Sequence, residues 1–263
     1  MSRLRLWIIA CLASWLTHAG AQPNNSAQRR ALDSPAVLKL AGMELVQTRR
    51  VFYKKFETDS LRFDLYAPLD LRADEQRPVV IFANWKRTSM PEWMLMISWG
   101  KLVAASGLHA ILYQSASDPT ADLDELVTYV RRHGARLQID GSRLALMTMS
   151  GNTVTALPFM TQAERDYIRC GVIYYGMIEK PLVRVDLPLL IVRAGLEGSA
   201  DLKRNLDEYI AQLLARNAPL TLINYPAGRH AFDLHDDNEQ SRAIMKETLV
   251  FLTRYLRAEG EHR

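Results

Sequence analysis

The sequence predicts an α/β fold: a mostly parallel central sheet with helices on both faces and an antiparallel pair of strands at its N-terminal edge. Short apolar runs alternate with helical segments across most of Pro78–Glu259, which is the pattern of strand–helix–strand units. Before that region, Arg49–Pro68 alternates apolar and polar residues, as two antiparallel strands do. The chain has 263 residues, 48% of them hydrophobic, which suits one domain with a sizeable core.

The predicted parallel strands are short, continuous apolar runs, as expected when helices cover both faces of a sheet. They are "PVVIFA" (Pro78–Ala83), Leu108–Gln114, Arg143–Met149, Cys170–Gly176, Leu187–Gly195 and Leu220–Pro226. Segments with helical spacing lie between them or follow them, at Leu95–Ser106, Thr120–Leu137, Gly151–Met160, Asp201–Asn217 and Asp237–Glu259. Asp236 and Glu239 have the spacing of a capping box at the start of the closing helix.

The N-terminus resembles a secretory signal rather than part of the fold. Arg3 and Arg5 form a positive region, and Leu6–Leu16 is an apolar stretch too short to span a bilayer comfortably. "AGA" at residues 19–21 supplies small residues for cleavage, so we expect residues 1–21 to be a signal peptide that is cut after Ala21. The mature protein is then expected to be exported, either periplasmic or secreted, without stable membrane insertion.

The remaining chain divides in two. Residues 22–45 are polar at first and are expected to form a flexible leader, and residues 46–263 a single domain. The formal net charge of +4 falls to +2 once Arg3 and Arg5 leave with the signal, which is too weak to indicate a nucleic-acid partner. Only Cys170 would remain as a cysteine, so no internal disulfide is expected, and we predict a buried strand thiol.

Ser150 is the first candidate functional residue. It follows the predicted strand Arg143–Met149 and precedes a helical segment, at the edge of a parallel sheet where reactive groups collect. That is the context of a nucleophile elbow, in which a tight turn exposes the serine oxygen and the amide of Gly151 helps to bind an oxyanion. Thr148 and Asn152 occupy the positions where G-x-S-x-G has glycine. The alternative interpretation is that Ser150 only caps the helix.

A nucleophilic serine needs a base, and the base needs an orienting acid. In a fold of this kind they follow in the order serine, acid, histidine, each after a later strand. His230 lies directly after the strand Leu220–Pro226 and before the closing helix, which is the place of the base. The acid should follow Leu187–Gly195, where Glu197 and Asp201 are both available. We prefer Glu197 because it is closer to the end of the strand, and Asp201 stays the alternative.

A second oxyanion donor should come from the loop after Pro78–Ala83. That loop begins with Asn84 and Trp85, and the backbone amide of either residue can serve because every non-proline residue carries one. The loop lacks the glycines that such loops often have.

Together these features resemble the α/β-hydrolase superfamily, particularly its dienelactone-hydrolase-like and prolyl-oligopeptidase-like serine esterases. The resemblance spans Leu61 to Arg257 and is carried by "LRFDLYAP", "RPVVIFAN", "SWGKLVAASGLHAILYQ", "DLDELVTYVRRHGARLQIDGSRLALMTMSGN", "LPLLIVRAGLE" and "GRHAFDLHDD". It implies that Ser150 carries an acyl group, His230 moves the proton and Glu197 orients the histidine.

The expected function is therefore cleavage of a small-molecule carboxylic ester or lactone through an acyl-enzyme. Two alternatives use the same fold: a catalytically inactive binding protein, and a peptidase or thioesterase with the same triad. No glycine-rich dinucleotide turn, phosphate loop or grouped zinc ligands occur in the sequence, so we expect neither a cofactor nor a metal.

Overall fold

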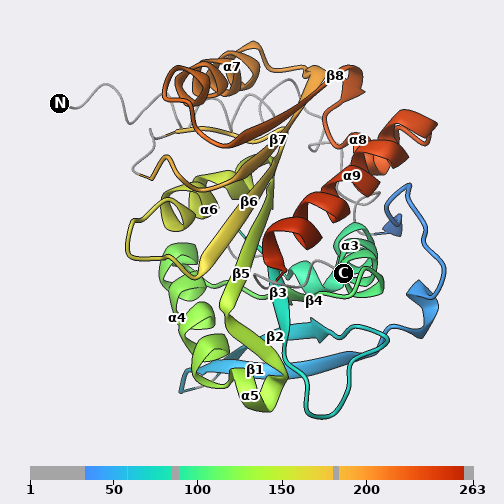
Figure 1. Ribbon diagram of the computed structural model, residues 1–263, viewed down its shortest axis with the longest axis vertical. Helices are drawn as coiled ribbons and strands as arrows, with labels where there is room; N and C mark the ends of the chain where they lie inside the picture. Colours follow the sequence, from blue (N-terminus) through green and yellow to red (C-terminus); the bar gives the residue numbers. More distant parts are fainter. Residues whose placement is uncertain (1–32, 58, 85–88, 180–183, 258–263) are drawn as a thin grey trace, which may run out of the picture.

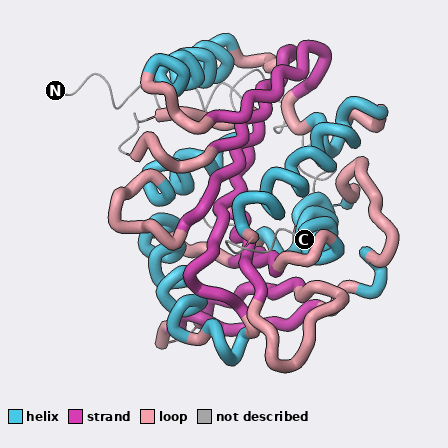
Figure 2. The backbone as a smooth tube through the Cα atoms, viewed as in Figure 1, coloured by secondary structure: helices cyan, strands magenta, loops and turns pink. Residues whose placement is uncertain are grey.

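The computed structural model describes residues 33–57, 59–84, 89–179 and 184–257. These residues contain an eight-stranded sheet with the order β1-β2-β4-β3-β5-β6-β7-β8 (Figures 1 and 2). The strands are β1 (Thr48–Lys55), β2 (Ser60–Tyr66), β3 (Arg77–Phe82), β4 (His109–Tyr113), β5 (Ile139–Met149), β6 (Ile168–Tyr174), β7 (Leu189–Leu196) and β8 (Leu220–Arg229).

The direction of the strands follows the prediction. β2 pairs antiparallel with both β1 and β4, whereas the pairs from β4 through β3 to β8 are all parallel. The predicted parallel sheet with an antiparallel N-terminal edge is thus confirmed. Because β3 to β8 run the same way, the loops that follow them emerge at one end of the sheet, which we call the carboxyl end.

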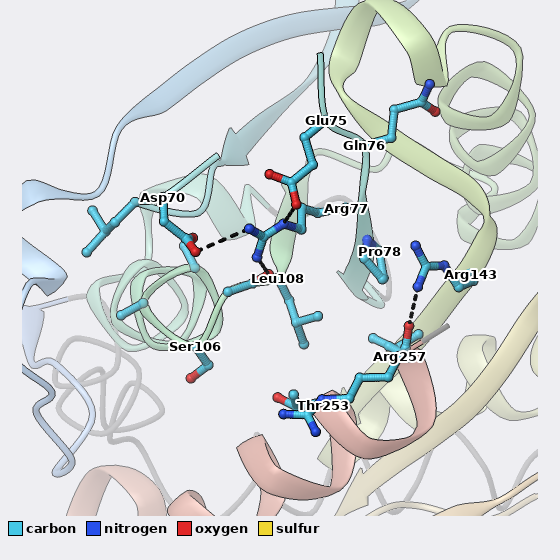
Figure 3. A pocket seen from close by; sticks show the side chains of 15 residues that line it. Asp70, Glu75, Gln76, Arg77, Pro78, Ser106, Leu108, Arg143, Thr253 and Arg257 are labelled. Carbon is cyan, nitrogen blue, oxygen red and sulfur yellow. Dashed lines mark hydrogen bonds and ion pairs between the residues drawn. The ribbon is translucent and has the colours of Figure 1, made fainter. Parts of the chain in front are cut away.

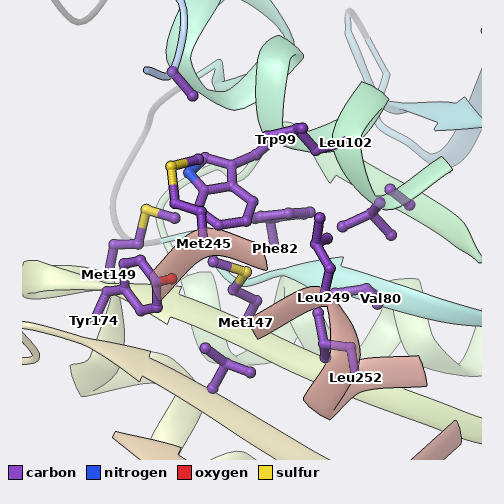
Figure 4. Packing of buried hydrophobic residues seen from close by; sticks show 14 of the residues in the cluster. Val80, Phe82, Trp99, Leu102, Met147, Met149, Tyr174, Met245, Leu249 and Leu252 are labelled. Atoms are coloured by element: carbon purple, nitrogen blue, oxygen red, sulfur yellow. The ribbon is translucent and has the colours of Figure 1, made fainter. Parts of the chain in front are cut away.

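Helices cover the sheet on two faces, as Figure 1 shows. One face packs against α3 (Met94–Ala105) and α9 (Glu239–Leu256), and the other against α4 (Pro119–Arg132), α6 (Thr153–Met160) and α7 (Ala200–Ala215). Side chains alternate along each strand, so neighbouring residues such as Val79 and Val80 enter different cores. Figure 4 shows the α3–α9 core, where Trp99 lies among Phe82, Met149 and Met245.

Short helices complete the chain: η1 (Met43–Leu45), η2 (Met90–Glu92), α5 (Gly134–Leu137), η3 (Ser150–Asn152) and α8 (Phe232–His235). The predicted capping box at the closing helix is wrong. Asn238 is the N-cap of α9, and its side chain accepts a hydrogen bond from the Ser241 amide. Asp236 instead accepts from the backbone and side chain of Arg229, which holds the loop after β8.

The expected flexible leader ends earlier than predicted. Within its described part, Ala36 and Leu38 are buried in the α3–α9 core. The Val37 amide donates a 2.9 Å hydrogen bond to the carbonyl of Asp233 in α8. A segment held by buried apolar side chains and a backbone hydrogen bond belongs to the folded unit, so that unit begins before residue 46. The predicted signal peptide and residues 22–32 lie outside the described residues.

Candidate active site

Ser150 lies at a strained turn between β5 and α6. Its φ of 51° is in the left-handed region, which costs a non-glycine residue energy and occurs at functional turns. Its carbonyl accepts a 3.0 Å hydrogen bond from the Met177 amide, which ties the turn to the loop after β6. Asn152, not Ser150, is the N-cap of α6, and Ser150 makes no side-chain cap hydrogen bond. The turn has the form of a nucleophile elbow, and the helix-cap interpretation of Ser150 is wrong.

His230 brings a base to this serine. It directly follows β8, and its Nε2 lies 2.9 Å from Ser150 Oγ, so the serine hydroxyl can donate to it. The Nδ1 atom hydrogen-bonds Glu197 Oε2, which leaves Nε2 as the acceptor when the imidazole is neutral. Ala231, the next residue, has a φ of 59°, so a second strained turn follows the histidine.

The carboxylate of Glu197 is the partner of the histidine Nδ1 atom. It follows β7, its side chain is 10% exposed, and its Oε1 accepts from the Ser199 amide at 3.1 Å. Burial alone would raise the pKa of Glu197, but hydrogen bonds from His230 and from the amides of Ser199 and Gly198 outweigh it, and the pKa lies below its ordinary value. Glu197 is therefore ionised at neutral pH, as a partner of a histidinium must be.

Asp201, the alternative acid, is not brought to the histidine. Its carboxylate is 61% exposed and forms a 2.8 Å salt bridge with Arg204 one turn later in α7. The cap of that helix is Ser199, whose hydroxyl accepts from the Leu202 amide. The structure thus assembles Ser150, His230 and Glu197 and leaves Asp201 on the surface.

The elbow accommodates a threonine where glycine is usual. Thr148 is buried and its hydroxyl donates to Thr153 Oγ1 at 3.4 Å, across the turn. Space for Thr153 comes from Gly176 after β6. A Cβ atom at residue 176 would lie 2.7 Å from Thr153 Oγ1 and 2.4 Å from Ile173 Cγ2. Gly176 thus leaves room for the threonine that pairs with Thr148.

The oxyanion donors are only partly as expected. Gly151 is the second residue of η3, and amides in the first turn of a helix have no partner within the helix, so they can bind an anion. Asn84 is a wrong prediction: it is fully buried, and its amide already donates to the Tyr113 hydroxyl at 3.0 Å. Trp85 lies outside the described residues.

Sequence analysis missed two residues that adjoin the site. Tyr175, after β6, has its ring 4.6 Å from the His230 ring. Asp233 is completely buried and accepts a 2.7 Å hydrogen bond from the Tyr175 hydroxyl. One signal was available for Tyr175, because it ends a parallel strand at the carboxyl end. Asp233 lies three residues after His230 in a polar segment, which nothing in the sequence marks as buried.

A cavity of about 630 Å³ lies away from these residues. It is lined from the amino ends of β3 and β5, the end of α3 and the end of α9. Arg77 in its wall pairs with Glu75 and Asp70, as Figure 3 shows. None of the predicted site residues lines it. Among the described residues, no three His, Cys, Asp or Glu side chains are grouped to hold a metal ion. No described helix has the length and apolar character needed to cross a membrane.

Comparison with known proteins finds similarity in structure. No protein-family model matches the chain, and no curated protein matches it. Among solved structures, it is similar to a bacterial heroin esterase (TM-score 0.67, 14% identity, 84% of this chain and 88% of that one). It is also similar to Thermogutta terrifontis esterase 2 phosphorylated by paraoxon (0.62, 14%, 81% and 96%), and to a mutant of the esterase rPPE (0.67, 14%, 89% and 89%).

Identities this low establish the fold alone. The strand order, the antiparallel edge and these likenesses together show that the chain has the α/β-hydrolase fold. Whether it shares the chemistry of these proteins depends on the residues at the carboxyl end of its own sheet.

Proposed function

We propose that this chain is an exported serine hydrolase that cleaves a small carboxylic ester or lactone. One observation carries the proposal: Ser150, His230 and Glu197 form a continuous hydrogen-bonded chain at a strained strand-to-helix turn. A serine that only caps a helix needs no histidine beside its hydroxyl. A histidine that only faces solvent needs no buried carboxylate as a partner. The three groups are in the order and the geometry that acyl transfer requires.

The proposed reaction has two halves. Ser150 Oγ attacks the carbonyl carbon while His230 Nε2 takes the hydroxyl proton, and Glu197 stabilises the resulting imidazolium. The negative oxygen of the tetrahedral intermediate is bound by the amide of Gly151 at the start of η3. The intermediate expels the alcohol, which receives the proton from His230. Water then attacks the acyl-enzyme by the same route, releases the acid and returns the proton to Ser150.

An ester or lactone is favoured as substrate on two grounds. The three solved structures described above, to which the chain is similar, are all named esterases. The site is also open: the His230 side chain is 35% exposed, which suits a small substrate that enters from solvent. The dienelactone-hydrolase-like or prolyl-oligopeptidase-like subtype and the export signal stay predictions. Export is tested by the N-terminus of the mature protein, expected at Gln22.

The direct test is covalent labelling of the purified mature protein with a fluorophosphonate probe. We expect wild type to be labelled, and Ser150→Ala and His230→Ala to be unlabelled although folded. Absence of labelling on folded wild type would contradict the proposal and favour a binding protein with a hydrolase fold. A matched set of ester, thioester and amide substrates with the same acyl group then separates an esterase from a thioesterase or a peptidase.

A further inference from the structure

Backbone strain is concentrated beside the proposed triad. In the described chain, five non-glycine residues have positive φ: Gln138, Ser150, Tyr175, Asn217 and Ala231. Gln138 is the C-cap of α5 and Asn217 follows the end of α7, which are ordinary places for this conformation. The other three are the serine, the residue after the histidine, and Tyr175 at the end of β6 with φ 38°. Strain at Tyr175 indicates that its position matters to the site.

Tyr175 packs directly on the base. Its ring centroid lies 4.6 Å from that of His230, with the planes inclined by 51°. Its amide donates to the Val192 carbonyl at 2.9 Å, so its backbone is fixed by β7. The loop after it continues to Met177, whose amide holds the carbonyl of Ser150. Tyr175 therefore adjoins both the serine turn and the histidine ring.

Asp233 holds the far end of Tyr175. Its carboxylate is completely buried, with one oxygen 2.7 Å from the Tyr175 hydroxyl and the other 2.8 Å from Trp99 Nε1. Burial raises the pKa of Asp233, while these two hydrogen bonds act in the opposite direction. Burial also holds the pKa of Tyr175 well above its ordinary value, so the phenol stays a neutral donor. Trp99 is itself packed in the α3–α9 core (Figure 4), which anchors this arrangement.

A carboxylate in this place is costly for the fold. No lysine or arginine of the described chain forms a salt bridge with Asp233, and the two groups that donate to its carboxylate, the Tyr175 hydroxyl and Trp99 Nε1, are neutral. An apolar residue of similar size would avoid that cost. Buried titratable groups whose burial costs free energy cluster at functional sites.

The geometry points to Tyr175 and Asp233 as positioning residues for His230, an inference that rests on the proposed function. Asp233 fixes the Tyr175 hydroxyl, and the Tyr175 ring, on its strained backbone, supports one face of the imidazole between Ser150 and Glu197. Asp233 lies in α8, three residues after His230. Tyr175 therefore contacts this one segment twice, through its hydroxyl at Asp233 and through its ring at His230. A base held in this way is aligned before substrate arrives, which matters because misplacement by about 1 Å can cost about 100-fold in rate.

The test compares the same substitution at neighbouring residues. Tyr175→Phe removes the hydroxyl that Asp233 holds. Tyr174→Phe removes the hydroxyl that lies 2.6 Å from Thr248 Oγ1 on α9. Both tyrosines are buried, and each variant loses one buried hydrogen bond, so their melting temperatures should fall by similar amounts. We expect Tyr175→Phe to lower kcat and the rate of fluorophosphonate labelling about 10- to 100-fold with KM within about twofold. Tyr174→Phe should leave all three within about twofold of wild type.

A second readout does not depend on activity. The Nδ1 proton of His230 should give a low-field ¹H NMR signal in wild type, because its acceptor is the carboxylate of Glu197. We expect the signal to move or broaden in Tyr175→Phe and to stay in place in Tyr174→Phe. If the fluorophosphonate probe did not label wild type, the proposed function would be contradicted. The NMR signal would still decide whether Tyr175 positions the histidine. An unchanged signal and an unchanged kcat in Tyr175→Phe would overturn the inference.

Asp233→Asn provides a further variant of nearly equal volume. It replaces one carboxylate oxygen by an NH₂ group, so the tyrosine and the tryptophan no longer each have an oxygen of their own to donate to. We expect kcat to fall as in Tyr175→Phe, and the double variant to lose no more than the larger single effect, because both changes act through one contact. Independent, multiplying effects would contradict a shared positioning role.

Discussion

The two ends of the parallel strands differ in what they hold. The amino ends border a cavity of about 630 Å³, in whose wall Arg77 pairs with Glu75 and Asp70. Near the proposed triad, at the carboxyl ends, a small cavity of about 10 Å³ lies between Tyr175 and α7. The carboxyl ends hold the strained turns at Ser150, Tyr175 and Ala231 and a chain of aligned hydrogen bonds.

A large cavity therefore does not by itself mark a reactive site. The guanidinium of Arg77 is satisfied by its neighbours and by the carbonyl of Gly107. Ser150 and His230, in contrast, are aligned with each other and still reach solvent. Chemistry needs groups held in a reactive arrangement, and the structure concentrates strain and buried polar contacts where it holds them.

The largest effect should come from the serine at the carboxyl end. Ser150→Ala is expected to lower kcat/KM for an activated ester by at least about 10⁴-fold, because no other group supplies the nucleophile. Ser106→Ala is the matched control, since Ser106 lines the amino-end cavity and only donates to the Leu102 carbonyl. Steady-state rates of both variants test the comparison directly. A comparable loss of kcat/KM in Ser106→Ala would contradict the assignment of the reactive site to the carboxyl end.

The next largest effect should separate the two candidate acids. Glu197→Gln is expected to lower kcat about 10³- to 10⁴-fold, because an amide favours the wrong tautomer of His230 and cannot stabilise its cation. Asp201→Asn should stay within about twofold of wild type, since Asp201 pairs only with surface Arg204. Rates of ester hydrolysis at pH 7 and 8 check both. Equal losses would mean that the hydrogen bond to Glu197 does not orient the base.

At the amino end, the expected effects are on stability. Burial lowers the pKa of His109, at the start of β4, to about 4, against an ordinary value of 6.5. The unfolded chain therefore binds a proton below about pH 6.5 that the folded chain takes up only near pH 4. Stability is fully present above that window and falls as the pH is lowered through it, by up to about 3 kcal/mol.

His109→Gln should reduce this loss. The amide can still donate to the Gln138 carbonyl, which His109 Nε2 contacts at 2.8 Å, but it takes up no proton. Urea-unfolding midpoints at pH 7 and pH 5 measure the effect, and labelling of Ser150 in the folded variant should be unchanged at pH 7. An equal drop between the two pH values in variant and wild type would refute the assignment to His109.

The smallest effect should follow from opening the ion pairs at the cavity. Arg77→Gln removes the contacts with Glu75 and Asp70, but Arg77 is 24% exposed and Asp70 72%, so solvent screens much of the attraction. We expect a loss of at most about 1 kcal/mol in the free energy of unfolding and an unchanged labelling rate. A fall in labelling larger than that of Glu197→Gln would show that the amino end takes part in the chemistry.

Much of the fold could be predicted because its signals are local. Apolar runs such as Pro78–Ala83 are typical of covered strands, and their alternation with helices indicates a parallel sheet. Ser150, His230 and Glu197 could be chosen as candidates for a related reason. Each follows a strand of that sheet, and parallel strands end at the same edge, so their order along the chain indicates nearness in space.

Other features depend on contacts that the sequence does not display. Asn84 has an amide like any other residue, and only the position of the Tyr113 hydroxyl removes it from the oxyanion hole. Asp233 is a polar residue, yet its side chain is completely buried. Its backbone carbonyl accepts from the Val37 amide and its carboxylate from Trp99 Nε1, and both partners lie far away in the sequence. The leader ends earlier than predicted for the same reason. Ala36 and Leu38 are buried against core residues that lie far away from them in the sequence.

The order of the elements, the direction of the strands and the candidate residues at the carboxyl end could thus be predicted from the sequence, because periodicity and chain order are local properties. Tertiary structure decided which of those residues meet. It aligned Glu197 rather than Asp201, strained the backbone at Ser150 and Tyr175, and buried Asp233 beneath the site. Hydrogen bonds form between atoms about 3 Å apart, and such nearness between distant segments exists only once the whole sheet has assembled.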